Sequence, residues 1–261
     1  MNFNLSFGGS RMKNELKSKA SNQNKDAIYQ VSLLQGLAYG DYYGSVALEE
    51  LKRHGDTGIG TFDRLNGELI MLDGVVYRAS GDGSIEVASD DETTPFAVVT
   101  FLNGDETKSL KAIPDYGALT KTLDEMVAAR GKNRFYMIRL DGVFRKMSVR
   151  SVYAQEEPYK PLVEVLRSQS LFDYENMEGT VVGLYCPPYM SHLNAVGWHM
   201  HFICADKTRG GHVLGLDIAH AVLTWDDIDA FELRLPRNAV FGGFDLTVDQ
   251  SEDIEKIEKS R

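Results

Sequence analysis

The chain has 261 residues, of which 43% are hydrophobic and 25% are charged, a composition typical of globular proteins rather than disordered or fibrous ones. Its 28 basic and 38 acidic side chains give a formal net charge of −10. Because nucleic-acid binding draws on clustered basic side chains, this balance argues against a nucleic-acid partner. No window holds the roughly 18 uninterrupted apolar residues of a membrane helix, so we expect no membrane partner either.

Two features of the sequence favour the cytoplasm. Met1 to Asn24 has no apolar stretch of about 7 to 15 residues, such as a secretory signal requires. Cys186 and Cys204 are too few for a disulfide framework and do not have the spacing of metal ligands. Residues 1–26, rich in Ser, Asn and Lys, are predicted to be a disordered leader.

Residues 27–155 are predicted to form an N-terminal domain built on a β-sheet. Ser45–His54 has the pattern of a short helix, with Ser45 as its N-cap and Gly55 as its stop. Between Gly58 and Asn103, strand-forming runs are separated by turn dipeptides, which is typical of an antiparallel meander. These dipeptides are Asn66-Gly67, Asp73-Gly74 and Asp82-Gly83.

Three further signals complete this half of the chain. Apolar residues at three-and-four spacing predict an amphipathic helix over Tyr116–Ala129. Phe135–Leu140 and Val143–Val152 are predicted to form a hairpin across Asp141-Gly142. The proline-containing stretch Ala154–Pro161 breaks the pattern and is our candidate domain boundary.

Residues 156–261 are predicted to form a C-terminal, metal-binding sheet domain with an active-site tail. Leu162–Ser168 can form a short helix. Four runs then have the character of strands of a second sheet: Gly179–Tyr185, Gly197–Cys204, Gly211–Leu223 and Phe231–Leu235. The expected fold class is therefore α/β (α+β), with two domains that are each built on a largely antiparallel sheet with flanking helices.

Three of the six histidines lie within fourteen residues, at positions 199, 201 and 212. Side chains two apart in a strand share a face, so His199 and His201 can present both imidazoles to one point. If the polar turn Asp206–Gly211 closes a hairpin, His212 faces this pair from the returning strand. Three neutral imidazoles with room for another ligand are typical of catalytic zinc, although clustered packing histidines are the plainer alternative.

Several separated motifs resemble the bacterial acetolactate decarboxylase family. They are GWHMHF followed by GGHVL, together with DTGIGTFDRLNGELIMLDG, LFDYENMEGTVVG and LRLP, and the similarity runs from about Ile28 to Glu258. The resemblance implies a two-domain α/β fold with a mixed sheet in each half, a homodimer, and zinc held by His199, His201 and His212.

The resemblance also implies further residues around the metal. Glu68 and Arg150 would line the metal cavity, and Thr61 would make a supporting contact. A glutamate of the C-terminal tail would join them, with Glu258 as our choice and Glu255 as the alternative. Without the resemblance, each of these residues has an ordinary structural explanation.

The implied activity is zinc-dependent decarboxylation of (S)-2-acetolactate to (R)-acetoin with release of CO₂. Loss of CO₂ requires an electron acceptor, and Zn²⁺ could provide one by stabilising an enediolate. We expect Arg150 to orient the substrate, and Glu68 and Glu258 to manage protonation. Arginine is a poor general acid, because its pKa exceeds about 12.

Two other interpretations remain open. A cupin-like metal-dependent oxygenase or isomerase also uses His-x-His and a later histidine, but it usually adds a glutamate shortly after the pair, where this chain offers only Asp206. A binding module pinned by structural zinc would need a fourth protein ligand.

Overall fold

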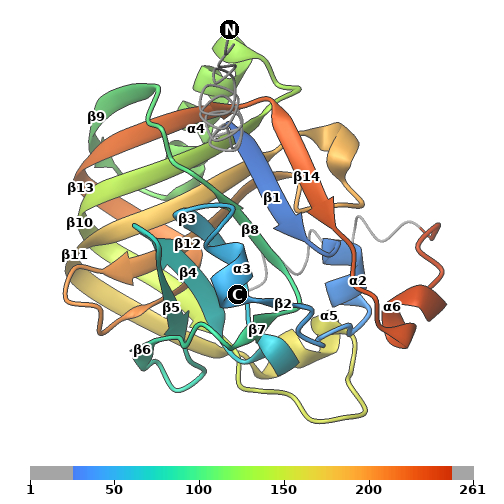
Figure 1. Cartoon of the computed structure of the whole chain (residues 1–261). Helices are drawn as coiled ribbons and strands as arrows, with labels where there is room; N and C mark the ends of the chain where they lie inside the picture. The colour runs from blue at the N-terminus through green and yellow to red at the C-terminus, as the bar shows by residue number, and fades with distance from the viewer. Residues whose placement is uncertain (1–25, 249–261) are drawn as a thin grey trace, which may run out of the picture.

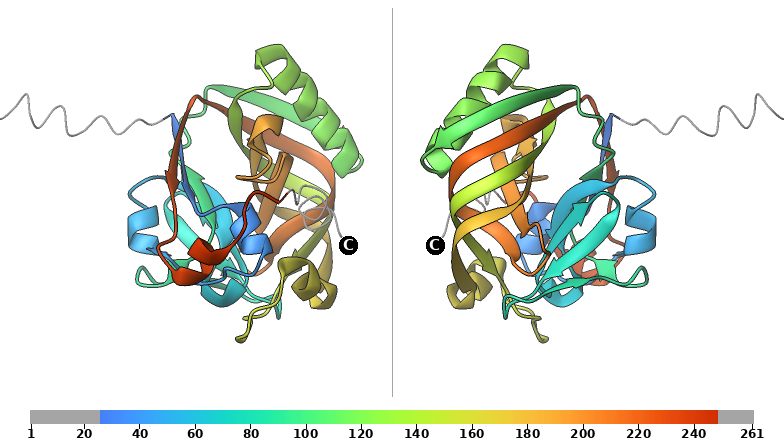
Figure 2. Two further views of the ribbon diagram at one scale, coloured as in Figure 1. Left: turned by 90° about the vertical axis from the view of Figure 1, so that its right-hand side faces the viewer. Right: turned by 90° about the vertical axis from the view of Figure 1, so that its left-hand side faces the viewer.

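A computed structural model describes residues 26–248. These residues form two large β-sheets that pack against each other and a small sheet of the two strands β2 (Val46–Ala47) and β7 (Thr93–Thr94). Helix α4 (Tyr116–Arg130) covers one of the large sheets on its outer side (Figures 1 and 2). The mixed α/β class expected from the sequence, with largely antiparallel sheets, is confirmed. Most of the predicted leader and all of the tail after residue 248 lie outside the described residues.

The first sheet has seven strands in the order β14-β1-β8-β3-β4-β5-β6. Among the described strands, only β1 and β14 pair in parallel. The strands are β1 (Ala27–Val31), β3 (Thr57–Thr61), β4 (Glu68–Leu72), β5 (Val75–Ala79), β6 (Ile85–Val87), β8 (Ala97–Thr100) and β14 (Ala230–Arg234). The predicted meander is confirmed from β3 to β6, and the turn glycines Gly67, Gly74 and Gly83 adopt the positive φ that such turns require.

The second sheet has five strands, all paired antiparallel: β9 (Glu106–Ile113), β10 (Phe135–Ser151), β11 (Ser170–Cys186), β12 (Gly197–Cys204) and β13 (Gly210–Ile228). Strand β10 pairs along most of its length with β11 and also with β13. Because β12 lies between β11 and β13, these four strands close on themselves.

The hairpin predicted across Asp141-Gly142 is wrong, because β10 runs through both residues without a turn. Gly142 lies opposite Gly179 on one neighbouring strand and Ala221 on the other. A Cβ at position 142 would lie 2.3 Å from the carbonyl oxygen of His220, so this glycine permits a close approach of strands. The Asp141 side chain accepts a hydrogen bond from Thr180 across the sheet, in place of the turn contact that the dipeptide suggested.

The assignment of Phe231–Leu235 to the second sheet is also wrong, since β14 pairs with β1 in the first sheet. Each sheet takes strands from both sides of the candidate boundary at residues 155 and 156. Strands β9 and β10 precede it and belong to the second sheet, whereas β14 follows it and belongs to the first. The division into residues 27–155 and 156–261 stays a prediction.

The helices are short apart from α4. The predicted helix at Ser45–His54 is only partly present: Ser45 donates its backbone N–H to Thr94, β2 (Val46–Ala47) follows, and α3 covers Leu48–Leu51. Helix α4 begins after its N-cap Asp115 and ends at Gly131, as the periodicity predicted. The remaining elements are α2 (Leu34–Ala38), η1 (Asp63–Leu65), β7 (Thr93–Thr94), α5 (Leu162–Val165), η2 (Leu166–Ser168), η3 (Pro188–Met190) and α6 (Ala239–Gly243).

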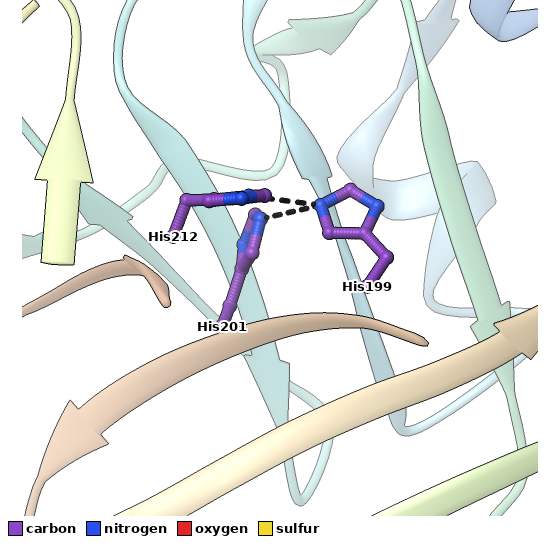
Figure 3. Close-up of side chains that lie close together, drawn as sticks. All are labelled: His199, His201 and His212. Atoms are coloured by element: carbon purple, nitrogen blue, oxygen red, sulfur yellow. Dashed lines mark hydrogen bonds between the residues drawn. The ribbon is translucent and has the colours of Figure 1, made fainter. Parts of the chain in front are cut away.

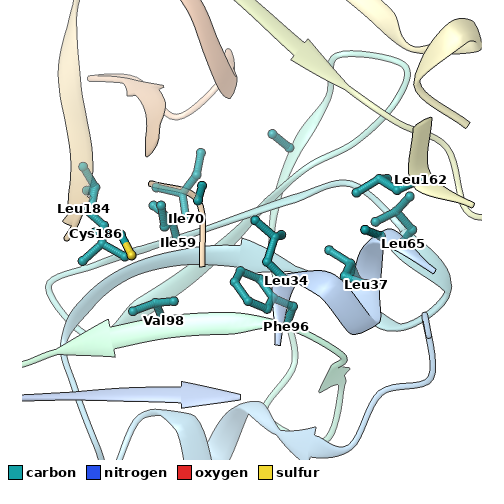
Figure 4. Close-up of a cluster of buried hydrophobic side chains, with 14 of the residues drawn as sticks. Leu34, Leu37, Ile59, Leu65, Ile70, Phe96, Val98, Leu162, Leu184 and Cys186 are labelled. Atoms are coloured by element: carbon teal, nitrogen blue, oxygen red, sulfur yellow. The ribbon is translucent and has the colours of Figure 1, made fainter. Parts of the chain in front are cut away.

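An apolar core fills the space between the two sheets (Figure 4). It joins Ile59 and Ile70 of the first sheet to Leu184 of the second. Leu34 and Leu37 of α2 belong to the same core and also line the site described below. The core therefore fixes the first sheet and α2 against the strands that carry the histidines. Among residues 26–248, no helix combines the length and the apolar character needed to cross a membrane.

Candidate metal centre and active site

His199, His201 and His212 converge on one point between the sheets (Figure 3). His201 of β12 lies directly opposite His212 of β13, so the expected hairpin is present. The Nε2 atom of His199 is 3.1 Å from Nε2 of His201 and 3.1 Å from Nδ1 of His212. All three side chains are buried, and their neighbours Met200 and Phe202 face the opposite core of the second sheet.

Burial keeps the imidazoles of His199 and His201 neutral. Burial, and then the positive charge of Arg150, lower the pKa of His199 to about 3. The pKa of His201 is also well below its usual value, because of burial and of the neighbouring His199. Neutral imidazole is the form that binds a metal ion.

The geometry of the triad fits a metal ion. Tetrahedral zinc, for example, with Zn–N bonds of about 2.0–2.1 Å, sets its ligand nitrogens about 3.3 Å apart. The two separations from His199 are close to this value. His201 Nδ1 lies 2.9 Å from the carbonyl oxygen of Leu69, and as the donor it would leave the Nε2 lone pair facing the other rings. Among residues 26–248, these histidines are the one group of three or more His, Cys, Asp or Glu ligands close enough to share an ion.

Strand β4 of the first sheet reaches this triad with Glu68. The Oε2 atom of Glu68 is 3.5 Å from Nε2 of His201, and its side chain is largely buried. Thr61 pairs with Glu68 across β3 and β4, and its hydroxyl donates to the carbonyl oxygen of Gly67 at 2.7 Å. Thr61 therefore lines the cavity and also holds the turn that leads into Glu68.

Arg150 reaches the same cavity from β10. It is 4% exposed, and its Nη1 donates to Oε1 of Gln169 at 3.2 Å. Glu68, Thr61 and Arg150 thus lie around the cavity together with His199 and His212. Glu258 and Glu255 lie outside the described residues, so their predicted place at the site stays a prediction.

The apolar wall of this cavity was not predicted from the sequence. The wall consists of Leu34, Leu37, Leu65, Phe96, Val152, Leu162 and Leu166. Leu162 and Leu166 stand four apart in a segment predicted to be helical, a spacing that could have revealed their common face. The others come from separate elements, and no local pattern connects them.

Two residues near the histidines in sequence belong to the hairpin turn. The thiol of Cys204 donates to Asp206, and its sulfur accepts backbone N–H groups from Thr208 and Arg209. Asp206 is exposed and also accepts from Thr208. A cupin-like site would need a carboxylate shortly after His-x-His. Asp206, the one candidate there, forms hydrogen bonds within the turn instead.

The fold and the triad define a mixed α/β protein with a three-histidine site suited to a metal ion. Residues 28–248 match the family model described as alpha-acetolactate decarboxylase. The chain is 40% identical to an alpha-acetolactate decarboxylase of Methanosarcina mazei over 92% of this chain and 82% of that protein. It is 38% identical to one of Bacillus subtilis over 89% and 91% of the two chains.

A solved structure agrees with these sequence matches. The crystal structure of alpha-acetolactate decarboxylase from Bacillus subtilis strain 168 superimposes with a TM-score of 0.87 and 37% identity, covering 90% of this chain and all of that one. The chain belongs to the alpha-acetolactate decarboxylase family. The resemblance noted in the sequence is confirmed.

Proposed function

We propose that this chain decarboxylates (S)-2-acetolactate to (R)-acetoin and CO₂, with Zn²⁺ held by His199, His201 and His212. The observation that carries the proposal is the convergence of three buried imidazoles beside a cavity that Arg150 and Glu68 also line. Membership of the family supports the choice of substrate. The apolar wall suits a substrate that carries two methyl groups.

The reaction breaks the bond between the carboxylate and its neighbouring carbon. The electron pair of that bond passes through the carbon to the adjacent keto oxygen, and a proton then adds to the carbon to give acetoin. Bound zinc supplies positive charge that stabilises the oxygen as it becomes negative. The negative charge of the carboxylate therefore moves to this oxygen when CO₂ leaves, and protonation of the carbon then neutralises it.

The residues of the chain have separate tasks in this proposal. Arg150 binds and orients the anion through its guanidinium N–H groups. Glu68 holds the proton that is delivered to one face of the carbon, which gives a single enantiomer. A glutamate of the tail, Glu258 or the alternative Glu255, assists it.

The proposal extends to the assembly and location of the protein. We infer a homodimer in the cytoplasm, with an N-terminal domain over residues 27–155 and a C-terminal domain over residues 156–261. Light scattering after gel filtration measures whether the protein is a dimer, and limited proteolysis tests the boundary between the two domains. The proposed reaction does not depend on the assembly, the location or the domain boundary.

Turnover of 2-acetolactate under nitrogen, before and after chelation, tests the function. We expect acetoin and CO₂ in equal amounts, loss of both after chelation, and recovery when Zn²⁺ is returned. Oxygen uptake would point instead to a cupin-like oxygenase. Tightly bound zinc without any turnover would indicate a metal that only stabilises the hairpin.

A further inference from the structure

We propose that Gln169 is a positioning residue that holds the guanidinium of Arg150 in the cavity while leaving its positive charge available to an anionic ligand. This inference rests on the proposed function. Gln169 belongs neither to the histidine cluster nor to the motifs shared with the family.

Arg150 is a buried cation that a neutral side chain holds by a hydrogen bond. Among residues 26–248, its guanidinium forms no ion pair with a carboxylate, and its Nε has no hydrogen-bond partner. Within this described part of the chain, the one side-chain hydrogen bond that Arg150 donates goes to the amide oxygen of Gln169. A buried charge is costly unless it is paired, so a cation kept in this way is suited to an anion that arrives from solution.

The side chain at position 169 decides how much of the positive charge of Arg150 remains available to a ligand. An amide oxygen accepts the hydrogen bond but carries no net charge. A glutamate there would make a stronger, charge-assisted hydrogen bond and would neutralise the guanidinium. Glutamine therefore orients Arg150 without competing with the carboxylate of the substrate.

The backbone places Gln169 well for this task. Gln169 directly follows η2, and its N–H donates to the carbonyl oxygen of Leu166, which lines the cavity. Ser170 then begins β11 directly opposite Ser151, the residue after Arg150. The short segment Leu162–Gln169 thus supplies both apolar wall and the hydrogen bond to Arg150.

The test compares Gln169→Glu and Gln169→Met in the full-length protein. Gln155→Glu, which adds the same charge outside the cavity, is the matched control. Calorimetric titration uses two probes: anionic 2-hydroxy-2-methylpropanoate, and neutral 3-hydroxy-3-methylbutan-2-one, in which a methyl group replaces the carboxylate of acetolactate. Steady-state kinetics with 2-acetolactate run in parallel.

We expect Gln169→Glu to weaken binding of the anionic probe and to raise KM for 2-acetolactate, each by about tenfold or more, because it pairs the buried charge. Binding of the neutral probe should change by less than about threefold. Gln169→Met, which removes the hydrogen bond, should lower kcat/KM. Gln155→Glu should behave like the wild type.

Two results would overturn the inference. If Gln169→Glu binds the anionic probe as well as wild type does, the residue serves only as a hydrogen-bond acceptor. If both variants leave binding and kinetics unchanged, Gln169 does not position Arg150. Should the wild type fail to turn over acetolactate while Gln169→Glu still weakens binding of the anionic probe, the proposed function falls and the role of Gln169 stands.

Discussion

Arg150 of β10 lies directly opposite His212 of β13 because the register of the two strands shifts by one residue beside them. Ser148 faces Gly215, but Val149 faces Val213, so Leu214 is passed over. Without this shift, Val213 would lie opposite Arg150. Since side chains alternate across a sheet, the shift decides which residues of β13 face the cavity.

Replacing Arg150 by lysine keeps the positive charge but removes the planar guanidinium, so it tests whether turnover requires the guanidinium itself. We expect Arg150→Lys to lower kcat/KM for 2-acetolactate by about 10- to 100-fold, as expected when hydrogen bonds to a charged group are lost. Arg145, five residues earlier on the same strand, pairs with Asp217 and is 44% exposed, so Arg145→Lys is the matched control. Equal kinetics for the two variants would remove Arg150 from the mechanism.

Replacing His212 tests the metal site. Loss of a partner that only supports a metal ligand weakens binding about 10- to 100-fold, so His212→Ala should weaken Zn²⁺ binding by at least about 100-fold. His220 lies on the same strand but is exposed, and His220→Ala should keep both zinc and turnover. Zinc content by elemental analysis and competition with a chelator provide the measurement. Full zinc occupancy in His212→Ala would contradict the assigned ligand set.

Asp226 predicts a pH dependence of stability. This fully buried residue of β13 accepts a hydrogen bond from the backbone N–H of Gly104, in the connection between the two sheets. Burial, and then the nearby Asp105, raise its pKa to about 7. Between about pH 4 and 7 the folded state therefore retains a proton that the unfolded chain releases.

Stability from this group is fully present below about pH 4 and is lost as the pH rises through 7. In urea unfolding, Asp226→Asn should remove a decrease on the order of a few kcal/mol between pH 4 and pH 8. Exposed Asp229, just beyond the end of β13, supplies the control variant Asp229→Asn. An unchanged pH profile in Asp226→Asn would show that the carboxyl is ionised throughout.

Gly142 predicts a steric effect in the second sheet. A Cβ there would lie 2.3 Å from the carbonyl oxygen of His220 and 2.6 Å from the Cα of Ala221, both of which belong to backbone. Gly142→Ala should lower the free energy of unfolding by about 1–3 kcal/mol. Gly242 in α6 has open space and an ordinary φ, so Gly242→Ala should cost nothing in thermal or urea unfolding. Similar losses in both variants would mean that the close approach at Gly142 is relaxed in solution.

Local pattern in the sequence determined the elements that depend on neighbours along the chain. Helix α4 followed from its apolar spacing, and the turns at Gly67, Gly74 and Gly83 followed from their dipeptides. The spacing of His199 and His201 put both on one face of β12, and the polar turn after them returned the chain to His212. These features are short-range, so periodicity and turn chemistry are sufficient to predict them.

Only the tertiary structure decided how distant strands are paired. The Asp141-Gly142 dipeptide has the composition of a turn, but long pairing with β11 and β13 keeps it extended. The same pairing, with its shift beside Val149, sets Arg150 against His212. The packing of α2 and α5 against the sheets adds the apolar wall of the cavity. Contacts between residues far apart in the chain leave no period in the sequence, so these relationships emerge only when the sheets close and pack.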